Sequence, residues 1–172
     1  MYLTRKKIEY FDKPEEELND TQLQALNEIR GWRNSRMAEI LGSATDIDRS
    51  KLIREAEMLN LWRWTCSLFF GRPSSRHVFR WSYSMQRNEG FAGKPYWPVS
   101  YIRMRAVSHN TSYFGSSVIL DALGTLLHEI VRVYQQSHAC DYCYAAEWNL
   151  QRNGLGRAWQ LHAARVEKCW TV

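Results

Sequence analysis

Near Gly71 the hydrophobic period of the sequence changes from that of a helix to that of a strand, and this change constrains the class of fold more than any other feature. Ahead of Gly71 the apolar residues recur at helical spacing, and they are Leu52, Ile53, Ala56, Leu59, Cys66 and Phe69 or Phe70. Beyond it, alternate residues are apolar from Phe79 to Met85, with polar residues such as Arg80 and Ser82 between them, which is typical of a half-buried strand. A long helix followed by a strand predicts an α+β fold.

The rest of the pattern predicts helices packed on one side of a small β-sheet. The expected elements are one or two short helices over 21–42, a helix capped by Asp46 or Asp48 and ended by Gly71, strands over about 79–85 and 99–107 with a hairpin-like connection, a helix over about 116–136, and a last helix beyond Gly156. We expect residues 1–45 to be a partly helical N-terminal extension and residues 46–172 to be the main domain.

Composition excludes several classes of protein. At 172 residues, 45% hydrophobic and 24% charged, the chain suits one globular domain. It has no apolar run long enough for a membrane helix, and its basic start, Met1 to Lys7, is not followed by an apolar segment, so we expect no membrane partner. The expected location is intracellular, in nucleus or cytoplasm, or outside the cell if a signal peptide has been removed.

Positive charge is concentrated in residues 72–105. This segment has six arginines and one lysine against a single acid, Glu89, and the arginines are Arg72, Arg76, Arg80, Arg87, Arg103 and Arg105. Aromatic residues such as Trp81 and Tyr101 are interleaved with them, and single-stranded nucleic acid is bound by this combination through its phosphates and bases. The plainer interpretation is that the arginines solvate the outer face of a strand whose rings face the core.

The helix over 116–136 contains a motif one residue away from His-Glu-x-x-His. In that motif two imidazoles at i and i+4 bind Zn²⁺ from one helix face, and the glutamate polarises a metal-bound water. Here the residues are His128, Glu129 and, at the second imidazole position, Arg132. The spacing also allows a structural interpretation, an i,i+3 ion pair between Glu129 and Arg132.

A second segment, Gly154-Leu155-Gly156-Arg157-Ala158-Trp159-Gln160, resembles the Gly-His-Gly-x-x-Trp-Gln segment of SprT-like zinc metallopeptidase domains. Over about residues 52–168 the chain is similar to fungal-like members of this family, which are zincins. The resemblance also includes Phe69-Phe70-Gly71, Trp81-Ser82, Arg103-Met104-Arg105 and Ala163-Ala-Arg-Val-Glu167. It implies a zincin-like fold in which the helix over 116–136 is the active-site helix.

The resemblance also implies that the metal site has been lost. Of the three zinc-ligand positions only His128 keeps its imidazole, because Arg132 is permanently protonated and Leu155 has no lone pair. His128 would be a vestigial ligand and Glu129 a vestigial base, and no cofactor is expected. The predicted function is that of a catalytically inactive pseudopeptidase that binds a macromolecule, with a protein or peptide as partner.

Two alternative functions stay open, an enzyme and a nucleic-acid-binding module. One is an active zinc metallopeptidase whose site is rebuilt from His128 with His109, His138 or a cysteine, which would need zinc as cofactor. The other is a nucleic-acid-binding module that uses residues 72–105. Either a secreted effector or an intracellular regulator would suit a small protein with a protease scaffold.

The exit of the same helix offers a separate candidate metal site. His138, Cys140 and Cys143 form it, with Cys169 or His162 as a further ligand. A single Cys-x-x-Cys is a weak signal, since the thiols are equally consistent with a family loop feature or with a disulfide in an oxidising compartment. Four cysteines are too few for a disulfide scaffold, so reduced thiols are expected.

Overall fold

A computed structural model describes residues 13–37, 39, 53–70, 76–82, 84, 90–93, 99–105 and 115–138. Its elements are η1 (Glu15–Glu17), α2 (Asp20–Trp32), the π-helical turn η2 (Arg33–Met37), α4 (Glu55–Phe70), β1 (Arg76–Ser82), β2 (Gly90–Gly93), β3 (Val99–Arg105) and α5 (Gly115–His138). The α+β class is therefore confirmed, as are a helix over 116–136 and a strand that begins at Val99. Among the described residues, no helix combines the length and apolar character that crossing a membrane requires.

The three strands form one sheet in the order β1-β3-β2. The prediction of a hairpin-like connection between β1 and β3 was wrong, because these strands are parallel and the segment between them contributes β2, which is antiparallel to β3. Two glycines, Gly90 and Gly93, bound this short strand, and glycines at such positions in a sequence are typical of turns. After β1 the chain first forms β2 at the far edge of the sheet, and it then forms β3 between β1 and β2.

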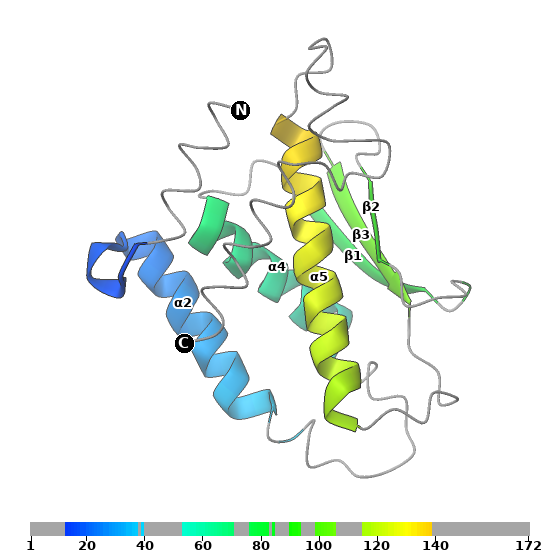
Figure 1. The fold of residues 1–172 in the computed structure, drawn as a ribbon, viewed down its shortest axis with the longest axis horizontal. Helices are drawn as coiled ribbons and strands as arrows, with labels where there is room; N and C mark the ends of the chain where they lie inside the picture. Colours follow the sequence, from blue (N-terminus) through cyan, green and yellow to red (C-terminus); the bar gives the residue numbers. More distant parts are fainter. Residues whose placement is uncertain are drawn as a thin grey trace.

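Helices α2, α4 and α5 all lie on one side of the sheet (Figure 1). The strands agree with this arrangement, since Phe79, Ile102 and Met104 are buried whereas Arg80 and Arg103 are exposed. Together with α4 and α5 the buried strand residues make one core, whose most deeply buried side chains include Trp62, Phe79, Ile53, Met58, Ile102, Ile130 and Val131.

Two side chains of β1 depart from the predicted alternation. Trp81 is only half-buried, although it packs on the core and its Nε1 donates a hydrogen bond to the Ile53 carbonyl oxygen at 3.0 Å. Ser82 was expected to face solvent and is buried, with its Oγ 3.3 Å from Ser84 Oγ. The strict period of two thus fails at the end of the strand, where Ser84 lies beyond the pairing with β3.

Helix α4 begins at Glu55, so the prediction that Asp46 or Asp48 caps it was wrong. The Arg54 backbone N–H donates to Glu57 Oε2 at 2.8 Å, which is the reciprocal half of a capping box with an arginine in place of the usual Ser or Thr. The shorter helix leaves Ala56 exposed, whereas Met58, Leu61 and Trp62 are buried.

Helix α2, which lies in the predicted N-terminal extension, packs against α4. Helix α2 has a capping box in which Asn19 Oδ1 accepts from the Gln22 N–H and Gln22 Oε1 accepts from the Asn19 N–H. The buried Gln22 side chain also donates to the Leu68 carbonyl oxygen of α4 at 2.9 Å. The predicted boundary at 45/46 lies outside the described residues.

Candidate functional site

The candidate site lies on α5, which is buried around much of its circumference near its C-terminal half. Ala122, Leu126, Ile130 and Val133 form a buried apolar face at helical spacing, and Val131 and Glu129 are buried as well. The helix packs against α4 on one side and against β2 and β3 on the other. At its far end the Tyr134 ring stacks on Phe70 of α4 with ring centroids 4.1 Å apart. This packing fixes the helix that presents His128, Glu129 and Arg132.

Glu129 and Arg132 form an ion pair in the protein interior. Arg132 Nη1 donates to both carboxylate oxygens of Glu129 at 3.2 Å, and the Glu129 residue is only 2% exposed. The structural interpretation of this spacing as an i,i+3 ion pair is therefore confirmed. Arg132 Nε is also buried, and the part of the chain that the structure describes offers it no hydrogen-bond acceptor. The carboxylate that would serve as the base of a metallopeptidase is thus held by a cation from its own helix.

His128 lies next to this ion pair, and its side chain is more exposed than those of Glu129 and Arg132. Its Nε2 lies 3.8 Å from Glu129 Oε1, and about a third of its side chain is exposed. Burial and, second, the charge of Arg132 lower the pKa of His128, which favours the neutral imidazole. His128 and Arg132 lie one helical turn apart, which is the spacing of the two imidazoles in the zinc motif.

The described residues of this site do not fit a catalytic zinc ion. Arg132 already neutralises the charge of Glu129, which weakens the attraction of a divalent cation to this carboxylate. One neutral imidazole is left as ligand, whereas a catalytic zinc is held by three protein ligands. Leu155, which occupies the third zinc-ligand position implied by the resemblance, lies outside the described residues.

The other proposed metal ligands are not tested by the structure. His138 is the last residue of α5, and Cys140 and Cys143 lie outside the described residues, as do His109, His162 and Cys169. Within the described ranges, no three His, Cys, Asp or Glu side chains gather in a way that could hold a metal ion. The fourth cysteine, Cys66, is a core residue, and burial raises the pKa of its thiol to about 12, which makes it a poor nucleophile or ligand.

The predicted nucleic-acid residues fall on the sheet. Arg76 and Arg80 lie on β1, and Arg103 and Arg105 lie on β3, while Arg72 and Arg87 are outside the described residues. Arg80 and Arg103 are register partners in the parallel pair. The structure therefore brings together two of these arginines that are distant in sequence.

Sequence reasoning missed one residue at this sheet, Glu55 at the start of α4. Its Oε2 accepts from Arg80 Nη1 at 2.7 Å, and its Oε1 accepts from the Trp81 backbone N–H at 2.9 Å. The partners are 25 and 26 residues away in the chain, so no local pattern could have pointed to them. Glu55 satisfies a backbone donor of the edge strand β1, as structures commonly do to cover a sheet edge.

Comparison with the models of known protein families gives no match, and comparisons with curated proteins and with solved structures give none either.

Proposed function

We propose that the protein is a SprT-like pseudo-metallopeptidase, a zincin-type domain that binds an extended segment of a partner protein without cleaving it. The observation that carries the proposal is the buried ion pair between Glu129 and Arg132. It joins the two motif residues whose chemistry a peptidase would need most, the base and the second ligand. A guanidinium at the ligand position replaces a metal ion as the local positive charge and holds the glutamate as a structural group.

The arrangement of the sheet supports the proposal that the protein binds an extended segment of a partner. β2 is an edge strand, and it packs against α5, the helix that carries the degenerate motif. The opposite edge strand, β1, has its Trp81 N–H satisfied by Glu55. An extended peptide added to β2 would form main-chain hydrogen bonds along an edge next to α5, and this mode of binding needs no metal.

Measurement of zinc content tests the proposal that the catalytic metal site has been lost. The purified protein is expected to contain well under one zinc per chain, and chelators are expected to leave its melting temperature unchanged, because a metal that binds only the native state would stabilise it. Arg132→His with Leu155→His would supply three imidazoles beside Glu129. This variant is expected to bind about one zinc per chain, and zinc should raise its melting temperature by several degrees.

The single variants are the matched controls, since each supplies only two imidazoles and should bind zinc far more weakly. Stoichiometric zinc in the starting protein that His128→Ala removes would contradict the loss of the site. A folded double variant that takes up no more zinc than the starting protein would show that positions 128, 132 and 155 do not converge, and the family resemblance would be wrong.

Peptide binding tests the other half of the proposal. Selection from a random-sequence peptide library is expected to yield extended binders, and methylation of alternate backbone nitrogens in a selected peptide should abolish its binding, because β-strand addition uses those donors. Methylation of the intervening nitrogens, which face away from β2, is the control and should have little effect. A library that yields no binder, or peptides that tolerate both methylation patterns, would contradict binding along the sheet edge.

A further inference from the structure

Strand β1 forms one edge of the described sheet, and side chains cover the main-chain groups of this edge. The Trp81 backbone N–H points away from β3, since it donates to Glu55 Oε1 at 2.9 Å. Residues two apart on a strand direct their main-chain groups to the same side, so the Phe79 carbonyl oxygen lies on this edge as well. Arg80 Nη1 lies 3.5 Å from that oxygen. A carboxylate therefore covers a donor of the edge, and a guanidinium lies near an acceptor.

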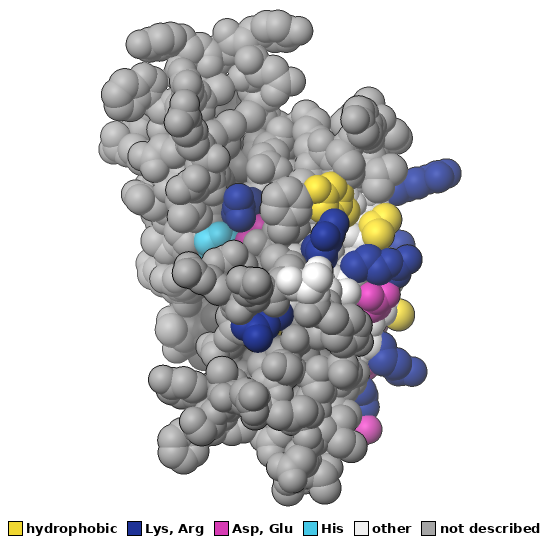
Figure 2. Space-filling model, turned by 90° about the vertical axis from the view of Figure 1, so that its right-hand side faces the viewer, with side chains coloured by type: hydrophobic (Ala, Val, Ile, Leu, Met, Phe, Trp, Pro, Cys, Tyr) yellow, Lys and Arg dark blue, Asp and Glu magenta, His cyan; other side chains and the backbone are white. Residues whose placement is uncertain are grey.

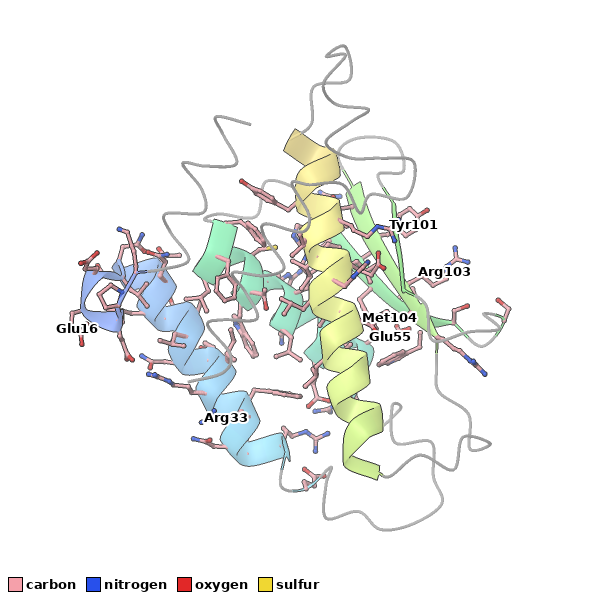
Figure 3. The ribbon with its side chains drawn as sticks, viewed as in Figure 1. Glu16, Arg33, Glu55, Tyr101, Arg103 and Met104 are labelled. Atoms are coloured by element: carbon pink, nitrogen blue, oxygen red, sulfur yellow. The ribbon has the colours of Figure 1, made fainter. Side chains whose placement is uncertain are left out.

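The two charged groups that cover the edge also bind each other. Arg80 Nη1 donates to Glu55 Oε2 at 2.7 Å, so the carboxylate binds the guanidinium with one oxygen and the backbone of β1 with the other. Figure 3 shows Glu55 beside the sheet. Figure 2, which looks at the side of the molecule where the sheet lies, shows acidic side chains next to basic ones at the surface.

This cover is accessible to solvent. The side chain of Arg80 is 68% exposed and that of Glu55 is 37% exposed. Exposed ion pairs contribute little to stability, so the cover can be removed without unfolding the protein. A substitution at Glu55 therefore reports on the edge of the sheet rather than on the core.

The sequence of β1 suits antiparallel pairing with a second copy of the same strand. If Phe79 faces the Phe79 of the second copy, Arg80 faces Val78, and its aliphatic stem can pack on this exposed apolar side chain. The neighbouring registers, two residues away in either direction, place Arg80 opposite Arg80 or Arg76 of the second copy. Like charges directly opposite are destabilising. The charges of β1 thus select one two-fold register.

We propose that β1 is a latent self-association edge, which Glu55 keeps closed by holding the Trp81 N–H, and that two copies of the chain pair through β1 when this carboxylate is removed. Covering an edge strand is a common way in which proteins avoid pairing with other chains. The partner is a second copy because the selected register places Val78 of each copy opposite Arg80 of the other. β1 is the edge opposite to β2, so the inference does not depend on the proposed peptide binding.

Glu55→Ala is the direct test. Amide hydrogen exchange at Trp81, measured at a concentration where the variant is monomeric, should become faster by about 5-fold or more, because one hydrogen bond is lost. In sedimentation velocity the variant should shift from monomer to dimer as its concentration rises, whereas the starting protein should show no such shift. Adding Val78→Arg to Glu55→Ala places like charges opposite each other in the selected register and should restore the monomer.

Two variants are the matched controls. Glu55→Gln keeps an acceptor oxygen for the Trp81 N–H, and Glu16→Ala removes the same charge from η1, far from Glu55 (Figure 3). Both should stay monomeric and exchange the Trp81 amide as slowly as the starting protein.

Unchanged exchange at Trp81 in Glu55→Ala, a folded Glu55→Ala variant that stays monomeric, or equal association of either control would overturn the proposal. So would a dimer that persists with Val78→Arg, since association would then use another surface. Growth beyond the dimer would contradict it as well, because two-fold pairing through one edge is closed.

Discussion

Trp62→Ala is expected to lower the free energy of unfolding by about 3 to 5 kcal/mol, because large aromatic residues removed from a packed core leave a cavity. Trp62 is completely buried in α4, and its ring lies against the His77 imidazole of β1 with ring centroids 4.2 Å apart. The substitution therefore weakens the contact between helix and sheet as well as the core itself. Thermal unfolding should show a melting temperature lower by about 10 °C for a chain of this size.

Trp64→Ala is the matched control for this prediction. Trp64 lies on the same helix and is only half-buried against the same core, so its replacement should cost less than half as much. A loss at Trp64 equal to or larger than the loss at Trp62 would mean that the face α4 turns toward the sheet has been assigned wrongly.

Glu129→Gln is expected to cost about 3 kcal/mol in the free energy of unfolding, because it leaves the guanidinium of Arg132 largely buried without its counter-charge. Arg132→Met removes the guanidinium from the more deeply buried carboxylate of Glu129 and should also lower the free energy of unfolding. The double variant Glu129→Leu with Arg132→Met removes both charges and should be about as stable as the starting protein, or more stable, since it also removes the buried Nε that has no acceptor among the described residues. Denaturant unfolding at neutral pH measures all three.

The exposed ion pair between Arg80 and Glu55 is the control that separates the effect of burial from the effect of pairing. Its N–O distance of 2.7 Å is shorter than the 3.2 Å between Arg132 and Glu129, but 68% of the Arg80 side chain is exposed. Arg80→Met should therefore cost less than about 1 kcal/mol, as exposed ion pairs do. If both single variants at the buried pair cost no more than this, the pair on α5 is not the structural element described above.

Local pattern predicted the elements of this fold better than it predicted how they pair. The apolar spacing from Ile119 to Tyr134 was enough to place α5, because a helix is stabilised within its own segment and the stripe is long. The same reasoning could not show that β1 and β3 are parallel. Strand pairing is decided by contacts between distant residues, and short Gly-bounded segments such as Gly90–Gly93 resemble turns.

The candidate site was predictable to a similar extent. An i,i+3 ion pair follows from the spacing of Glu129 and Arg132, and it is present. The depth of its burial was not foreseen, because an i,i+3 spacing shows that two charged side chains can meet but not how deeply they are buried. The role of Glu55 depends on partners brought close only by the tertiary structure.

The place of β3 at the centre of the sheet has a consequence for the order in which the chain can fold as it is synthesised. β1 and β2 do not pair with each other, and both pair with β3, the strand made last. Residue 76 finds its partner only at residue 99, so no two-stranded part of this sheet exists until β3 has left the ribosome. Until then the apolar side of β1, with Phe79, can be shielded by α4, which is already made and shares its core. Helix α4 must therefore protect β1 from association with other chains until β3 is made, and closure of the sheet through its central strand is a late, non-local step.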